Sequence, residues 1–285
     1  MDHEEVMALL SRNKRKREEA NAAASASSQP GFNELKFEDP WSINIQLAIP
    51  SASTVHDHAD HKTTVMQVPL SPIPCIVRPL KPGDEAALQA FGLRGLSDES
   101  RRLFAPYGWA APEEQLLAEF TASITNSQSK RDLHLVALAN DKVCCHGFLW
   151  SMCDEIPELG IAVADAWHGR GLARRMMALL ERACVAAGKP AIELTTMQDN
   201  ERAHSVYRQA GYEDLGIIRN PLGVDVTAAF AGTAVATKFS DEHHMCRFLD
   251  EQARARIEEA MAAKRRRAAE LFGAGPDAPS LAGSQ

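Results

Sequence analysis

The residues of this chain best suited to binding chemistry lie in the stretch HGRGLA at positions 168–173. It joins ELGIAVA, which has the composition of a buried strand, to RRMMALLERACVAAG, which has the apolar spacing of a helix. The first turn of a helix presents unpaired N–H groups and a partial positive charge, and it can hold a phosphate or pyrophosphate. Gly169 and Gly171 would leave room for that group to approach. Arg170 adds a positive charge, and the small Ala173 lets the first turn lie close to the strand. Taken alone, the six residues fit an anion-binding turn and a plain strand-to-helix turn equally well.

Two common nucleotide-binding motifs are absent from the sequence. There is no G-x-x-x-x-G-K-[ST] loop, and the glycines of the HGRGLA stretch do not have G-x-G-x-x-G spacing. The turn is therefore not explained by either of these phosphate-binding loops.

The elements around this turn alternate between strand and helix patterns. Strands are expected at residues 76–80, 133–139, 143–152, 158–164 and 191–196, and helices at 86–93, 113–124, 172–187 and 200–210. Asn140–Lys142 would form a hairpin turn, and Gly188 followed by Pro190 would end the long helix. This order predicts an α/β fold with a mixed sheet.

The two ends of the chain differ in composition from its middle. We expect a largely disordered N-terminal arm (1–75), one compact domain (76–230), a helical extension (231–272) and a disordered tail (273–285). Residues 43–48 could form a short strand, and a last strand or two would lie around 225–230. The helix, expected from about residue 240, could pack on its own domain, pair with a second copy as a homodimer, or dock elsewhere.

Composition and charge narrow the function classes. A net charge of -7 argues against general nucleic-acid binding and suits a cationic substrate. No apolar run approaches the roughly 18 residues that span a membrane, and the first residues lack the order of a signal peptide. The 6 cysteines have no C-x-x-C spacing, which favours reduced thiols in a cytoplasmic protein. His56, His58 and His61 match no ordered metal-binding spacing, so we expect no metal cofactor.

Three further features occur together between residues 158 and 212. The turn matches the pattern [QR]-x-x-G-x-[GA] except at its first position, and the strand AIELTT is soon followed by Asn200. The residues from Asn200 to Tyr212 match N-x-x-A-x-x-x-Y-x-x-x-G-[FY]. With IVRPLKPGDEAALQAF and LSDESRRLF before them, these features resemble the GNAT superfamily of acyl-CoA-dependent N-acetyltransferases over about residues 76–215. The family usually has Gln or Arg where this chain has His168, which could make acyl-CoA affinity depend on pH.

The resemblance implies a fold, a co-substrate and a binding mode. It implies a mixed, mostly antiparallel sheet flanked by helices, with acetyl-CoA as the co-substrate. Backbone groups of the strand would pair with the pantetheine arm, and N–H groups of the turn would hold the pyrophosphate. Asn200 would help to position the arm or the thioester. The residues expected to bind the co-substrate are Ile161, Val163, His168, Gly169, Arg170, Gly171, Leu172, Ala173 and Asn200.

The resemblance also implies the transfer of an acetyl group to an amine. The amine must lose its proton to attack, and the departing thiolate is helped by a proton donor. Tyr207 matches the donor of the family. Glu158 could act as the base, directly or through water, with Glu155 and Asp154 as rivals in the same turn. The acceptor could be a protein lysine, a peptide N-terminus or a small amine.

A second reading of the same features is a non-catalytic acyl-CoA-binding regulatory or interaction protein. The substitution at His168 and the long flanking segments motivate it. Acetyl-CoA binding without turnover would favour this alternative over the enzyme.

Overall fold

The computed structural model describes residues 39–49, 72–221 and 239–272, and these contain one eight-stranded sheet. Its spatial order is β1-β2-β3-β4-β5-β6-β8-β7, and every neighbouring pair is antiparallel except β5 and β6. The sheet is therefore mixed and mostly antiparallel, as predicted. The strands are β1 (Ile45–Ile49), β2 (Ile73–Pro79), β3 (Leu133–Ala139), β4 (Lys142–Trp150), β5 (Glu158–Val163), β6 (Ala191–Met197), β7 (Glu213–Pro221) and β8 (Phe239–Phe248).

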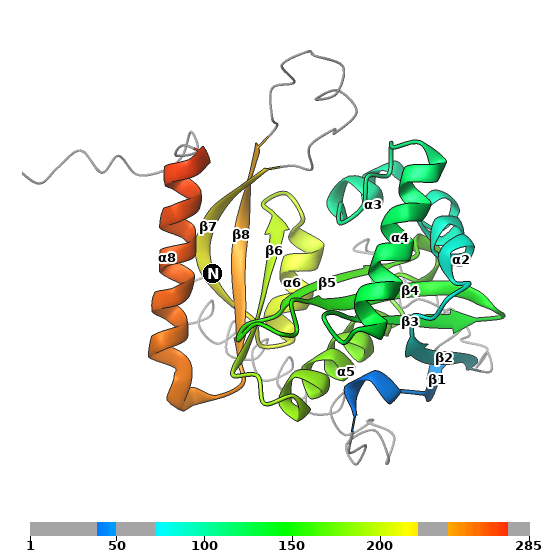
Figure 1. Cartoon of the computed structure of the whole chain (residues 1–285), viewed down its shortest axis with the longest axis horizontal. Helices are drawn as coiled ribbons and strands as arrows, with labels where there is room; N and C mark the ends of the chain where they lie inside the picture. Colours follow the sequence, from blue (N-terminus) through cyan, green and yellow to red (C-terminus); the bar gives the residue numbers. More distant parts are fainter. Residues whose placement is uncertain (1–38, 50–71, 222–238, 273–285) are drawn as a thin grey trace, which may run out of the picture. The chain divides into compact units, whose positions relative to one another are not determined.

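Helices flank this sheet on both faces (Figure 1). The α-helices are α2 (Glu85–Ala90), α3 (Asp98–Leu103), α4 (Glu113–Gln128), α5 (Leu172–Ala186), α6 (Glu201–Gln209) and α8 (Arg254–Phe272). Shorter helical turns are η1 (Pro40–Ser42), η2 (Phe91–Gly95), η3 (Asp165–Trp167) and η4 (Glu251–Ala253). Among the described residues, no helix combines the length and the apolar character of a membrane span.

Side chains of β4 show which helices cover each face. A Cβ added at Gly147 would lie 2.7 Å from Met176, so this face of β4 lies against α5. The ring of His146, the preceding residue, stacks on Tyr107 beside α4 and points to the other face. Because directly paired residues of neighbouring strands share a face, Glu158 lies on the α4 side of the sheet.

The last helix, α8, packs on its own domain. Its residues Ala253, Ile257 and Met261 join Cys246 and Phe248 of β8 in one buried apolar cluster. Figure 1 shows α8 alongside β7 and β8. Of the three positions left open for this helix, the structure therefore has it on its own sheet.

One sequence prediction is wrong near the C-terminal end of the domain. Residues 239–248 were expected to be helical, yet they form β8, which lies between β6 and β7 and supplies hydrogen-bonding partners to both. The α8 helix begins only at Arg254. Within the arm expected to be largely disordered, residues 40–49 form η1 and β1; β1 lies where a short strand at 43–48 was considered, and it pairs with β2. The expected strand at 225–230, the tail, and the arm apart from residues 39–49 and 72–75 lie outside the described residues.

Candidate functional site

The sheet separates between β5 and β6. These strands run parallel but pair at a single position, Glu158 with Glu193, where the N–H of Glu193 donates to the carbonyl of Pro157 over 3.0 Å. Beyond this bridge β6 continues beside β8, and Figure 1 shows β6, β8 and β7 turned away from β3–β5. One edge of β5 therefore has no strand beside it among the described residues.

The backbone of β5 presents hydrogen-bonding groups at this open edge. In an antiparallel pair, every second residue bonds to the neighbouring strand. Ala164 donates to the carbonyl of Cys144 over 2.9 Å, so the even-numbered residues bond to β4 and the odd-numbered ones point away from it. Ile161 thus directs both its N–H and its C=O into the gap between β5 and β6. An extended polyamide could add there as a further strand.

The glycines of the HGRGLA turn adopt the left-handed conformation that favours glycine. Gly169 has φ 73° and Gly171 has φ 74°. A Cβ added at Gly171 would meet no atom within 4 Å, so open space lies in front of the turn. Gly171 caps α5 without a side-chain hydrogen bond. The first N–H groups of α5 are therefore available to an anion.

Arg170 is held at the edge of this turn. Its guanidinium donates to the carbonyl of Ala166 over 2.9 Å and lies 4.8 Å from the ring centre of Trp167. These contacts fix a positive charge close to the start of α5, where it adds to the field of the helix.

His168 is locked between two partners. Its Nε2 lies 2.8 Å from the carbonyl oxygen of Val163, and its Nδ1 lies 2.8 Å from the guanidinium of Arg202. A carbonyl needs a donor and a guanidinium needs an acceptor, so the ring is the neutral tautomer with its proton on Nε2. Burial, reinforced by Arg202, lowers the pKa of His168. Any pH dependence that His168 gives to acyl-CoA affinity would therefore occur at lower pH than for an ordinary imidazole.

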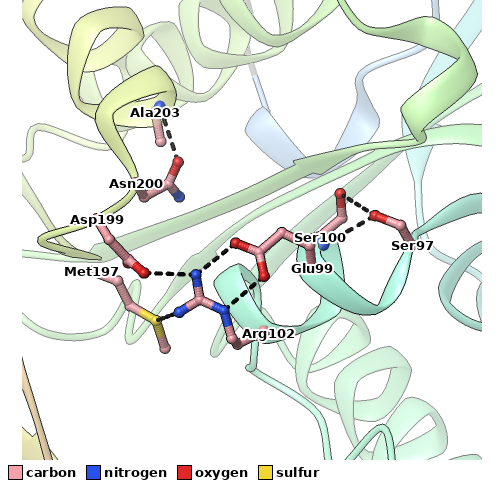
Figure 2. A network of polar contacts seen from close by, with 8 residues as sticks. All are labelled: Ser97, Glu99, Ser100, Arg102, Met197, Asp199, Asn200 and Ala203. Atoms are coloured by element: carbon pink, nitrogen blue, oxygen red, sulfur yellow. Dashed lines mark hydrogen bonds and ion pairs between the residues drawn. The ribbon is translucent and has the colours of Figure 1, made fainter.

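Asn200 caps α6 (Figure 2). Its Oδ1 accepts from the N–H of Ala203 over 3.2 Å, which is the usual role of Asn at this position. This hydrogen bond fixes the orientation of the side chain. The amide NH₂ group and the second lone pair of Oδ1 can still contact a ligand.

Residues 98–212 match the family model described as Acetyltransferase (GNAT) family. The match is to an acetyltransferase domain, and it contains the gap between β5 and β6, the glycine turn, Asn200 and Tyr207.

Solved structures of acetyltransferases share the fold of this GNAT domain. RimL, the ribosomal L7/L12 alpha-N-protein acetyltransferase in complex with coenzyme A, is 11% identical with a TM-score of 0.50, and the match covers 62% of this chain and 94% of RimL. Mycobacterium smegmatis RimJ in complex with CoA-disulfide is 15% identical with a TM-score of 0.50, covering 79% of this chain and 97% of RimJ. No curated protein matches the chain in sequence.

Tyr207 of the GNAT domain is buried within α6. Its side chain is 7% exposed, and burial raises its pKa to about 12. The ring lies 5.9 Å from that of Tyr212, and within the described residues its hydroxyl makes no hydrogen bond. The hydroxyl is thus a protonated group whose hydrogen bond is free for a ligand.

Glu158 lies at the point where β5 and β6 separate. Burial raises its pKa, Lys264 of α8 counteracts this, and the neighbouring Glu193 adds to the rise. Its rivals lie in the preceding turn, where Glu155 forms an ion pair with Arg256 of α8. Glu158 is therefore the candidate whose surroundings make it a stronger base.

A buried ionic cluster beside Glu158 was missed by the sequence analysis. Glu193 is 7% exposed and accepts from His244 over 2.8 Å and from Lys264 over 2.9 Å. Burial alone would raise the pKa of Glu193, but these partners hold it below its ordinary value. The three residues come from β6, β8 and α8, and no local sequence pattern connects them.

Helix α3 links the ends of β5 and β6, another feature that the sequence did not reveal. Asp165, after β5, accepts from the N–H of Ser97 over 3.1 Å and from the hydroxyl of Ser100 over 2.7 Å. Arg102 donates to Asp199, after β6, over 2.7 Å (Figure 2). Asp165 and Asp199 are far from this helix in the sequence, so no local pattern connects them to it. The helix thus connects the two strands across the end at which they are separated.

Proposed function

We propose that this chain is an N-acetyltransferase that moves an acetyl group from acetyl-CoA to a primary amine by direct attack. The observation that carries the proposal is the open edge of β5, which leads into the glycine turn at the start of α5. Acetyl-CoA has an extended arm with two amides joined to a pyrophosphate. A free strand edge followed by a free helix N-terminus suits that order of groups.

Each binding group then has a defined partner. The N–H and C=O of Ile161 pair with the pantetheine arm. The N–H groups from Arg170 to Ala173 hold the pyrophosphate, with the guanidinium of Arg170 beside it. Val163 offers its N–H, while its carbonyl already accepts from His168 and has one lone pair left for the arm.

The acceptor approaches on the face of the sheet that carries Glu158. Glu158 takes a proton from the ammonium form of the acceptor, directly or through one water molecule, and so frees the nitrogen lone pair. The nitrogen forms a bond to the thioester carbon, the bond from that carbon to sulfur breaks, and the nitrogen releases its second proton to water to leave a neutral amide. The electron pair of that bond leaves with the sulfur, which ends as the thiol of CoA.

The pKa of Tyr207 limits how it can assist the leaving sulfur. An ordinary thiol has a pKa of about 8.5, well below the value of about 12 for Tyr207. Complete transfer of the tyrosine proton would therefore be uphill. Tyr207 acts mainly by donating a hydrogen bond that stabilises the thiolate, and the sulfur gains its proton as solvent enters.

The acceptor is a primary amine, and the carboxylates near Glu158 suit a cation. Glu193 and Glu242 both act electrostatically on Glu158, and α8 borders this region through Lys264. RimL is described as an α-N-protein acetyltransferase. Peptides with a free N-terminus therefore belong in the test panel beside lysine peptides and small amines.

The experiment is thiol release from acetyl-CoA, measured with that panel for the native chain, Tyr207→Phe and Tyr212→Phe. Tyr212→Phe is the matched control because it removes the same atom from a neighbouring tyrosine whose hydroxyl is buried without a hydrogen bond. We expect turnover with one acceptor class, lowered more than about tenfold by Tyr207→Phe and unchanged by Tyr212→Phe.

The other outcomes are distinguishable. Equal turnover in the two variants would keep the enzyme and remove Tyr207 from the reaction. Acetyl-CoA binding without turnover for any acceptor would favour the non-catalytic acyl-CoA-binding protein.

A further inference from the structure

Three side chains outside the proposed catalytic residues converge beside β7 and β8. They are His204 of α6, Asp214 of β7 and His243 of β8. His204 Nε2 lies 3.1 Å, and His243 Nδ1 2.8 Å, from the same oxygen, Oδ2 of Asp214. The two imidazole rings stack with their centres 4.3 Å apart. All three nitrogen and oxygen atoms lie within 4.8 Å of one another.

The backbone orients the carboxylate of Asp214 toward both rings. The pairing of β7 with β8 shifts register between Asp214 and Ile217, and Gly216 in this bulge has φ 105°. The N–H of Gly216 donates to Oδ1 of Asp214 over 2.9 Å. Bulges often redirect a side chain toward a site, and a bound Oδ1 leaves Oδ2 to face the histidines.

His243 has a buried nitrogen that makes no hydrogen bond to the protein. Its Nδ1 is inaccessible to solvent and forms no hydrogen bond, although Oδ2 of Asp214 is only 2.8 Å away. The contact thus has the distance of a hydrogen bond without its direction. A cation placed between the rings and the carboxylate would give this nitrogen a partner.

We propose that His204, Asp214 and His243 bind one divalent transition-metal ion of the zinc type, with water completing its coordination. Two imidazoles and one carboxylate from separate elements form a known donor set for Zn²⁺. The donor atoms must move closer together, since zinc ligands lie at about 2.0–2.2 Å from the ion. Rotation of the three side chains can supply that movement.

Two arginines near Asp214 would repel a bound cation. Arg208 has its Nη2 3.9 Å from Oδ2 of Asp214, but its side chain is 62% exposed and can turn into water. Arg265 of α8 also acts electrostatically on Asp214. The site therefore needs both histidines, and loss of one should abolish tight binding.

The ion would tie α6 to the sheet. His204 stands one helical turn before Tyr207, so the bound metal would hold this helix against β7 and β8. Metal binding itself does not depend on the proposed acetyl transfer. The two proposals can therefore fail separately.

The test is zinc binding by the full chain, with the histidine tract of the N-terminal segment silenced. His56→Asn, His58→Asn and His61→Asn remove that tract, which could bind metal adventitiously. After dialysis against a chelator, Zn²⁺ is titrated by calorimetry near pH 7.5, and Co²⁺ is added separately as a probe of coordination by visible absorption. We expect one Zn²⁺ per chain and an absorption band of bound Co²⁺.

Variants of the cluster decide the outcome. His243→Asn and His204→Gln should each weaken zinc binding at least about 100-fold, with circular dichroism checking that each variant is folded. His168→Gln is the control, since this imidazole is likewise half-buried but lies outside the cluster. Absence of saturable one-to-one binding would overturn the proposal. So would binding of unchanged affinity in folded His243→Asn and His204→Gln.

Discussion

Replacing Gly171 with alanine tests the anion-binding turn, with a control at the other end of the same helix. Gly171 precedes α5 with φ 74°, and Gly188 follows it with φ 68°. A Cβ at either position would meet no protein atom within 4 Å. The two substitutions therefore cause the same backbone strain without a clash. They differ in that only Gly171 lies where we place the pyrophosphate of acetyl-CoA.

The expected losses of stability and of acetyl-CoA affinity follow from comparing the two glycine variants. A left-handed backbone costs a residue other than glycine about 1–2 kcal/mol. Each variant should lose that much free energy of unfolding, or roughly 2–8 °C in Tm. The strain is present with and without ligand, so it cancels from the binding free energy. The added methyl group at Gly171 should also displace one charge-assisted hydrogen bond, worth about 1.5–3 kcal/mol. The Kd of acetyl-CoA should therefore rise roughly 10- to 150-fold in Gly171→Ala alone.

Calorimetric titration with acetyl-CoA and thermal unfolding of the native chain and both variants provide the measurement. Similar losses of Tm with a raised Kd in Gly171→Ala alone are the expected pattern. If both variants bind acetyl-CoA as tightly as the native chain, the pyrophosphate does not lie at this turn. If both lose affinity equally, the loss comes from strain in α5 and not from a contact with the ligand.

Three further predictions rest on charged groups near the site. Glu158→Gln should lower turnover about 100-fold or more. It should also remove the rise in rate as pH passes through the raised pKa of this base, measured as initial rates across pH. The control variant Glu155→Gln should change neither the turnover nor its pH dependence. Burial lowers the pKa of His168 below its ordinary value of 6.5, so the folded state favours the neutral imidazole. The resulting stabilisation of the fold is present above pH 6.5 and is lost as the pH falls through the pKa of the folded state. The Kd of acetyl-CoA should therefore be constant from about pH 7 to 9, and a titration step there would contradict the assignment. The pKa of Glu193 is held below 4.5, so its stabilising contribution is present above that value and lost at lower pH. His244→Ala should cost about 1.5–3 kcal/mol at neutral pH, the loss of one hydrogen bond to a charged group, because Lys264 still pairs with Glu193. It should also weaken the acid dependence of urea unfolding.

The local elements could be predicted from the sequence wherever a pattern was contained within a few residues. The predicted strand at 133–139 has the bounds of β3, and the predicted strand at 191–196 is one residue shorter than β6. The expected helix at 172–187 ends one residue beyond α5. Apolar spacing, capping residues and glycine stops act over one or two turns, so a single segment carries the whole signal.

The prediction failed where pairing decides the structure. Residues 239–248 contain polar and charged side chains that fit a helix or a strand, and their proximity to α8 favoured a helix in the sequence. Their place between β6 and β7 satisfies backbone groups on both sides, and this tertiary gain outweighs a weak local preference.

The residues of the candidate site fall into the same two groups, those that a local motif contains and those that only the fold brings together. By itself, the sequence identified the turn at residues 168–173, the capping Asn200 and Tyr207, because motifs with fixed spacing contain them. Only the tertiary structure revealed that Ile161 faces a gap between strands, that His168 is neutral, and that the Val163 carbonyl accepts from His168. It alone brought His204 next to His243, 39 positions along the chain, since tertiary packing of a helix residue against a strand residue does not depend on their separation in sequence.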